Sequence, residues 1–254
     1  MKKAVSIFIA FLFVSFLIGC KDAETETHIP ADGFALSEPE TETLPDFLYV
    51  SAPSGLTLRQ HNNLNSEKLA VMPYCTKVRV VGPETEKTMT VGGIEGGMHE
   101  VEFNHKTGFA FSGYLSQFFP PEEDIKPRAY AEALREKHPK VTFNETSGGT
   151  ASSPTNTAML GLPTTQWHEA FFIATELFGI PKNFAFPQPK GSASETVQDT
   201  KKPKNTMESE LVVTRNNDQI QKIEYRYRAK GYGYDVSIVK GETAMEISRT
   251  EVSN

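Results

Sequence analysis

Hydrophobic and polar residues alternate along several short stretches in the first half of the chain. The clearest of these stretches are 56–59, 77–81, 99–103 and 109–111. A period of two is typical of a β-strand that buries one face, and turn residues such as glycine and proline separate the stretches. Several short strands within residues 47–119 predict an all-β small barrel or a sandwich.

The second half begins with two stretches that have helical periodicity. Residues 126–138 are rich in alanine, glutamate and leucine and stop at Pro139, and residues 164–179 place their apolar side chains at helical spacing. Alternation then returns in four stretches separated by turn residues: 208–215, 219–228, 232–239 and 243–250. We therefore predict that residues 121–254 form an α+β domain, with two helices packed on an antiparallel β-meander.

Four tyrosines recur at a period of two near the end of this domain, at Tyr225, Tyr227, Tyr232 and Tyr234. If the turn falls at 229–231, all four lie on one face of adjacent strands, and Arg226 and Arg228 lie on the opposite face. The functional interpretation is an aromatic platform or a carboxylate-binding pair of arginines. The simpler interpretation is a packed sheet face with solvated arginines outside.

Three segments have the composition of loops or linkers. Residues 146–157 and 187–206 are rich in serine, threonine, glycine and proline, so we expect mobile loops there. Residues 20–46 contain eight acidic residues and three prolines, and such a segment buries too little apolar surface to offset its ordering entropy. We therefore predict that residues 20–46 form an acidic disordered tether. The net charge of -6 argues against nucleic acid as a partner.

The N-terminus has the pattern of a secretion signal, because two lysines precede an uncharged apolar run over residues 4–18. This run is shorter than the roughly 20 residues that a membrane span needs. It ends in Leu-Ile-Gly-Cys, which resembles the lipobox of bacterial lipoproteins. The resemblance implies that a signal peptide, residues 1–19, is removed and that Cys20 carries a lipid. The protein would then be anchored to a bacterial membrane outside the cytoplasm, on the periplasmic face or the cell surface.

Four segments of the β-rich part follow the order of motifs in a known family. They are Tyr-Val at 49–50, Leu-Thr-Leu-Arg at 56–59, Met-Pro-Tyr-Cys-Thr-Lys-Val at 72–78 and Lys-Thr-Gly-Phe-Ala-Phe-Ser-Gly-Tyr-Leu at 106–115. In order and spacing these segments resemble the bacterial SH3-like (SH3b) domain, which is therefore expected over residues 47–120. Cys75 stands where that family usually has glycine, and Phe109 stands where it usually has tryptophan.

The resemblance implies binding rather than catalysis, because SH3b domains are mostly accessory modules of envelope proteins. The expected ligand is peptidoglycan or an envelope protein. Candidate ligand-binding residues are Tyr49, Phe111 and Tyr114, beside the glycine-rich segment 92–97, since aromatic faces suit sugar rings and peptide stems. The alternative is that these aromatic side chains fill the core.

Patterns of catalytic and metal sites are missing or incomplete. His168-Glu169 begins like a zinc-protease motif, but Phe172 stands where the second histidine is needed. With Cys20 used for the lipid, Cys75 has no disulfide partner, and we interpret it as a small, partly buried structural side chain. No Gly-x-Ser-x-Gly occurs in the chain. We therefore expect no catalytic residue, no metal and no cofactor.

Two other functions stay open. A hydrolase acting on the cell wall would need a cleft in which carboxylates such as Glu145, Glu169 and Glu176 converge. A periplasmic inhibitor or assembly partner of another protein would need an exposed hydrophobic patch.

Overall fold

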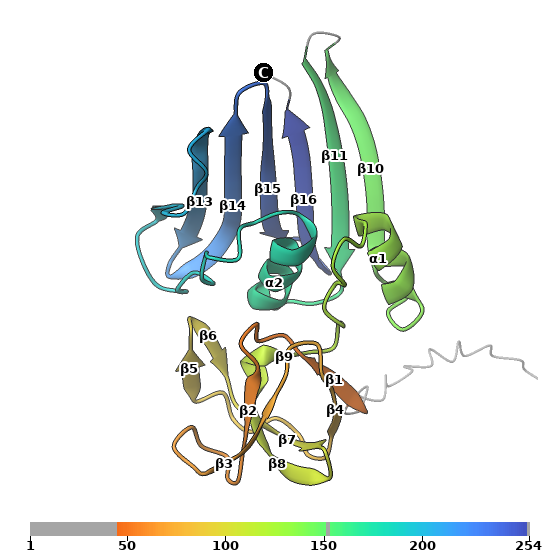
Figure 1. Ribbon diagram of the computed structural model, residues 1–254, viewed down its shortest axis with the longest axis vertical. Helices are drawn as coiled ribbons and strands as arrows, with labels where there is room; N and C mark the ends of the chain where they lie inside the picture. The colour runs from red at the N-terminus through yellow and green to blue at the C-terminus, as the bar shows by residue number, and fades with distance from the viewer. Residues whose placement is uncertain (1–44, 151–152, 253–254) are drawn as a thin grey trace, which may run out of the picture. The chain divides into compact units, whose positions relative to one another are not determined.

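Two seven-stranded antiparallel sheets and two α-helices dominate the part of the chain that the computed structural model describes, residues 45–150 and 153–252 (Figure 1). The predicted signal peptide, Cys20 and nearly all of the predicted tether lie outside the described residues. Neither helix in the described ranges is long and apolar enough to cross a membrane.

The first sheet has the strand order β3-β2-β8-β7-β4-β1-β9, and we call residues 47–119 the β-module. Its strands are β1 (Phe47–Val50), β2 (Leu56–Arg59), β3 (Lys68–Met72), β4 (Lys77–Val80), β7 (Met98–Phe103), β8 (Lys106–Phe111) and β9 (Leu115–Ser116). The four alternating stretches of the sequence are confirmed as parts of β2, β4, β7 and β8. In β2, for example, Leu56 and Leu58 are buried while their neighbours are half-buried.

The predicted all-β module is confirmed, but it does not close into a barrel, because the end strands β3 and β9 form no ladder with each other within the described residues. The reason is local. A 3-10 turn, η1 (Ser112–Tyr114), follows β8, and β9 keeps only two residues, both of which pair with β1. The structure shows an open antiparallel module, and membership of the SH3b family stays a prediction.

The glycine-rich segment forms a tight hairpin in which β5 (Met89–Val91) pairs with β6 (Ile94–Gly96). Its two turn residues, Gly92 and Gly93, have φ angles of 58° and 82°. Two left-handed residues in succession are typical of a two-residue turn that matches the twist of the strands. The hairpin buries Ile94, which is 2% exposed, and leaves Glu95 at the surface.

The second sheet has the order β10-β11-β16-β15-β14-β13-β12. Its strands are β10 (Thr142–Thr150), β11 (Ser153–Leu162), β12 (Ser194–Gln198), β13 (Thr206–Asn216), β14 (Gln219–Ala229), β15 (Tyr232–Lys240) and β16 (Met245–Val252). The helices α1 (Pro127–Arg135) and α2 (Trp167–Leu177) lie on one face of this sheet (Figure 1). The predicted four-stranded meander with two helices is confirmed as β13–β16, but the sheet is larger.

The extra strands come from the stretches that we expected to be mobile loops. Residues 146–157 belong mostly to β10 and β11, and β12 lies within 187–206. β10 pairs with β11 along nine positions, and β11 pairs in turn with β16. Strand formation depends strongly on neighbouring strands, so a serine- and threonine-rich segment becomes a strand where a partner offers a ladder.

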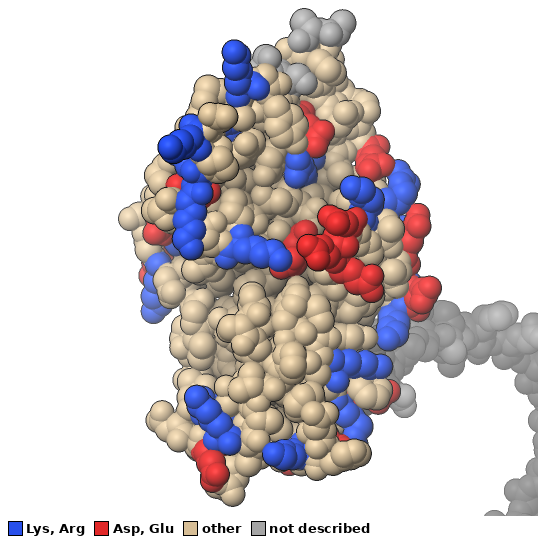
Figure 2. All heavy atoms as spheres, viewed as in Figure 1, with Lys and Arg blue, Asp and Glu red and all other residues tan. Residues whose placement is uncertain are grey.

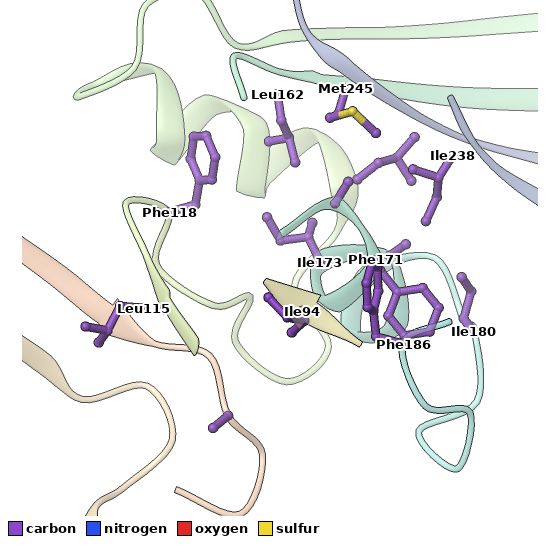
Figure 3. Close-up of a cluster of buried hydrophobic side chains, with 14 of the residues drawn as sticks. Ile94, Leu115, Phe118, Leu162, Phe171, Ile173, Ile180, Phe186, Ile238 and Met245 are labelled. Carbon is purple, nitrogen blue, oxygen red and sulfur yellow. The ribbon is translucent and has the colours of Figure 1, made fainter. Parts of the chain in front are cut away.

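Helix α2 is buried on two sides and joins the β-module to the second sheet. Phe172 stacks on Tyr114 of the β-module with ring centroids 5.9 Å apart. Phe171 meets the ring of Phe186 edge-on at 5.7 Å. Figure 3 shows the resulting cluster, which runs from Ile94 of the β-module past α2 to Met245 of the second sheet. The described residues therefore form one compact unit with a continuous core.

Candidate functional site

Two adjoining hollows lie where the β-module meets the start of α2. Their volumes are about 460 and 710 Å³, and they share the lining residues Glu95, Thr165, Gln166 and His168. We treat them as one site and call it the interface groove. Among its other lining side chains are Glu84, Lys87, Trp167, Asn217, Gln221 and Lys240. The groove is therefore built from three parts of the chain that are far apart in sequence.

The first turn of α2 presents Trp167 and His168 to the groove. The backbone N–H of Gln166 donates a hydrogen bond of 3.1 Å to Thr164 Oγ1, which fixes the entry into the helix. The His168 ring lies edge-on to Phe172 and Phe186, at 6.5 and 6.2 Å. Burial, aided by nearby Lys87, lowers the pKa of His168 to about 4. The imidazole is thus neutral at neutral pH and offers one donor and one acceptor.

Glu169, the next residue, fastens α2 to the β-module. It is buried, and its two carboxylate oxygens accept hydrogen bonds from Ser116 Oγ at 2.6 Å and from Thr164 Oγ1 at 2.5 Å. Burial raises the pKa of this carboxyl, although these hydrogen bonds act in the opposite direction. Because both oxygens have partners, Glu169 positions the groove walls rather than forming an acid–base pair with His168.

The β-module wall of the groove is held by a second carboxylate. Glu84 Oε1 accepts hydrogen bonds from Ser112 Oγ at 2.6 Å and from the backbone N–H of Gly97 at 3.0 Å. Lys87 Nζ lies 3.9 Å from the other oxygen of Glu84. This side of the groove therefore combines a fixed anion with a cation that keeps a long, adaptable stem.

The groove offers binding chemistry of several kinds. Trp167 supplies aromatic surface, Gln166, Asn217 and Gln221 supply amides, and acidic and basic groups occur on both walls. Within residues 45–150 and 153–252, no three His, Cys, Asp or Glu side chains lie close enough to hold a metal ion.

The three predicted ligand-binding residues do not form one surface. Phe111 is 3% exposed and belongs to the core. Tyr114 packs between Phe111 and Phe172, although it lines a small hollow of about 240 Å³ together with Phe111. Tyr49 lies elsewhere, against Phe119. The structure brings Phe111 and Tyr114 together and leaves Tyr49 apart, and a role for any of them in binding stays a prediction.

The glutamates that a hydrolase would require have three separate environments. Glu145 forms an ion pair with Arg128, and Glu176 forms one with Lys182 at 2.8 Å. Glu169 is buried beside Ser116. The large exposed hydrophobic side chains are likewise dispersed over the loop after β4 and six strands of both sheets: Phe47, Val71, Val81, Met159, Val197, Met207 and Tyr232. In the view of Figure 2, acidic side chains gather at the level of the helices, beside an uncharged part of the β-module.

Cys75 differs from our interpretation in one respect, because its side chain is exposed rather than partly buried. Its φ angle of 65° is the left-handed conformation that glycine adopts most easily. That conformation turns the side chain outward at the start of β4. Desolvation by neighbouring atoms and the charge of Glu176 raise the pKa of this exposed thiol, although a hydrogen bond with Tyr74 acts in the opposite direction.

Several groove residues lie in stretches whose sequence pattern predicts structure but no site. Trp167 belongs to the stretch 164–179, whose helical spacing predicts an inward-facing apolar side, yet its side chain is only partly buried and lines the groove. Asn217 and Asp218 lie between the predicted strands 208–215 and 219–228, and they form the expected turn with φ angles of 50° and 59°. The one signal available was the single tryptophan of the chain, at a helix start beside polar residues.

Comparison of the chain with known protein families, with curated proteins and with solved structures finds no match. Function must therefore be inferred from the groove itself and from the sequence resemblances.

Proposed function

We propose that this protein is a non-catalytic envelope lipoprotein that binds peptidoglycan in the interface groove. The observation that carries the proposal is the composition of the groove, where Trp167 and a set of amide side chains lie between acidic and basic groups. Lipidation of Cys20 and tethering by residues 20–46 are parts of the same proposal and rest on the sequence.

The chemistry of the ligand fits such a lining. A peptidoglycan fragment carries sugar rings, amide groups, carboxylates and an amine. Trp167 offers a flat apolar face to a sugar ring, and Lys87 and Lys240 offer partners to carboxylates. Glu95 and Asp218 offer partners to an amine. Small-molecule sites typically measure roughly 300–1,000 Å³, a range into which both hollows fall.

In this proposal the β-module binds its ligand through the wall of the interface groove. The SH3b resemblance favoured aromatic side chains of the module alone, but α2 packs on Tyr114 through Phe172. The surface that stays open includes Glu95, which shares the groove with the start of α2. Binding therefore requires both halves of the described unit, and the lipid anchor would let the protein join a membrane to the wall.

Co-sedimentation with purified peptidoglycan sacculi tests this proposal. The mature chain with Cys20→Ser stays in solution and is compared with the same chain carrying Trp167→Ala. We expect wild type to pellet and Trp167→Ala to lose about tenfold in affinity, the equivalent of about 1.4 kcal/mol. The matched control is Phe47→Ala, which removes an aromatic side chain that is 43% exposed on β1. Equal pelleting of Trp167→Ala and wild type, or no pelleting of wild type, would contradict the proposal.

A further inference from the structure

The tyrosine face of the second sheet is a single surface, as the sequence predicted. Directly opposite residues share a face of a sheet. One row across β14, β15, β16, β11 and β10 consists of Tyr227, Tyr234, Glu251, Asn156 and Ser147. The neighbouring row contains Tyr225, Val236, Arg249, Ala158 and Glu145. The two rows cross most of the sheet.

Only part of this face is covered by the helices. Tyr225 is 1% exposed and packs against Phe184, so for this residue the interpretation as a packed face is confirmed. Tyr232 is 40% exposed, and Tyr227 and Tyr234 are half-buried. Figure 1 shows the strands continuing past the end of α2 toward the turn between β14 and β15. The outer three tyrosines lie along that uncovered length.

The three outer tyrosine rings contact one another and the side chain of Arg249. Tyr227 stacks on Tyr234 with centroids 5.1 Å apart and planes 28° apart, and Tyr232 lies 6.0 Å from Tyr234. The guanidinium of Arg249 covers the Tyr234 ring at 3.8 Å and donates to Tyr232 OH at 2.6 Å. A platform fixed in this way loses little conformational entropy when it binds a ligand.

The C-terminal end of α2 also contacts this group of tyrosines. Arg249 Nη1 donates a hydrogen bond of 2.9 Å to the carbonyl oxygen of Phe178, and Tyr234 OH donates one of 2.9 Å to the carbonyl oxygen of Gly179. Terminal carbonyls of a helix need such donors, and a cation there is favourable. The aromatic platform is therefore tied to the helix that also lines the interface groove.

Beside the tyrosines lies a polar hollow of about 370 Å³ whose lining includes Glu145, Ser147, Asn156, Arg249 and Glu251. Its charges cancel in pairs, since Arg249 bonds Glu251 at 3.2 Å and Arg128 forms an ion pair with Glu145. A face with paired charges gives no attraction to a polyanion. Hydroxyl, amide and carboxylate groups next to flat rings suit an uncharged ligand that is rich in hydroxyl groups.

We propose that this tyrosine face is a second binding site, and that its ligand is the glycan strand of peptidoglycan, bound through uncharged N-acetylated sugar rings. The rings stack on Tyr232 and Tyr227, while hydroxyl and acetamido groups reach Asn156 and Glu251. The inference rests on the proposed function in naming the wall as the source of the glycan. The site itself is separate, because the groove lies at the ends of β14 and β15 opposite to the outer tyrosines.

Fluorine NMR of the Cys20→Ser chain labelled with 3-fluorotyrosine tests the proposal, with a soluble oligomer of N-acetylglucosamine as the probe. Tyrosine-to-phenylalanine variants assign the resonances. We expect the oligomer to shift the resonances of Tyr227, Tyr232 and Tyr234 and to leave that of Tyr74 unchanged. Tyr232→Ala should weaken binding about fivefold or more, the size of one lost aromatic contact. The matched control Phe47→Ala should bind as wild type does.

The groove variant Trp167→Ala separates the two proposals. The oligomer should shift the tyrosine resonances of this variant as it does those of wild type, although the variant binds sacculi more weakly. Unchanged tyrosine resonances at millimolar oligomer would overturn the second site, and so would equal affinities of Tyr232→Ala and wild type. Neither result would bear on the proposed binding in the interface groove, which the sacculus assay tests.

Discussion

Replacement of Glu169 tests how the β-module is held on α2. The carboxylate accepts hydrogen bonds from Ser116 and Thr164 in a buried setting. Each such bond contributes about 0.5–1.5 kcal/mol, and a buried hydroxyl left without its partner costs about 1–3 kcal/mol. We therefore expect Glu169→Ala to lower the free energy of unfolding by about 2–4 kcal/mol. Glu169→Gln keeps the shape and one acceptor oxygen, and its NH2 group can donate to the second hydroxyl once that hydroxyl has rotated, so it should cost less than Glu169→Ala.

The pH dependence of the free energy of unfolding, compared between wild type and Glu169→Gln, tests the protonation of Glu169. Burial raises the pKa of Glu169 in the folded state above its unfolded value of about 4.3. Such a group contributes its full stability below the unfolded pKa and loses it as the pH rises through the folded pKa. Wild type should therefore lose stability relative to Glu169→Gln as the pH rises. His168 shifts in the opposite sense, but it is present in both proteins and cancels in the difference.

Urea unfolding followed by tryptophan fluorescence, from pH 4 to pH 8, measures these differences. Glu145→Gln is the control, because Glu145 is exposed and its replacement should change stability by less than about 0.5 kcal/mol. A difference between wild type and Glu169→Gln that does not vary with pH would refute the assignment of a raised pKa. Equal loss of stability in Glu169→Gln and Glu169→Ala would refute the role of the hydrogen bonds.

Three further predictions concern single residues. Cys75→Gly should raise the free energy of unfolding by about 0.5–1 kcal/mol in urea titrations, because glycine relieves the left-handed strain at φ 65°; a loss of stability would contradict this. Ile94→Ala should destabilise the protein by about 2–4 kcal/mol, since Ile94 is 2% exposed in the shared core; a change below about 1 kcal/mol would show that the hairpin is not packed there. The imidazole NMR resonances of His168 should not titrate between pH 7.5 and pH 5.5, because its pKa is lowered to about 4, and a midpoint near pH 6.5 would show that the ring is solvated.

Local patterns in the sequence predicted the elements that depend on local information. Alternation located β2, β4, β7 and β8, and the turn at Asn217 and Asp218 located the boundary between β13 and β14. The period of two placed four tyrosines on one face, which their ring contacts confirm. The helical spacing that ends at Gly179 located α2 to within a few residues.

Features that depend on distant pairing were missed. The stretch 146–157 has the composition of a loop, yet it forms strands because β11 pairs with β16, almost 100 residues later, and β10 pairs in turn with β11. The interface groove could not be predicted for the same reason, since Glu95, Gln166 and Gln221 meet only after both sheets have packed on α2. Phe172 covers Tyr114 through a tertiary contact, which no local sequence pattern predicts.

Amide hydrogen exchange with and without a soluble disaccharide-peptide released from sacculi tests the central claim most directly. The account predicts slower exchange on binding in β6 (Ile94–Gly96) and in the first turn of α2, at Trp167 and His168. Unchanged exchange in both segments at a saturating concentration of the fragment would contradict binding in the interface groove.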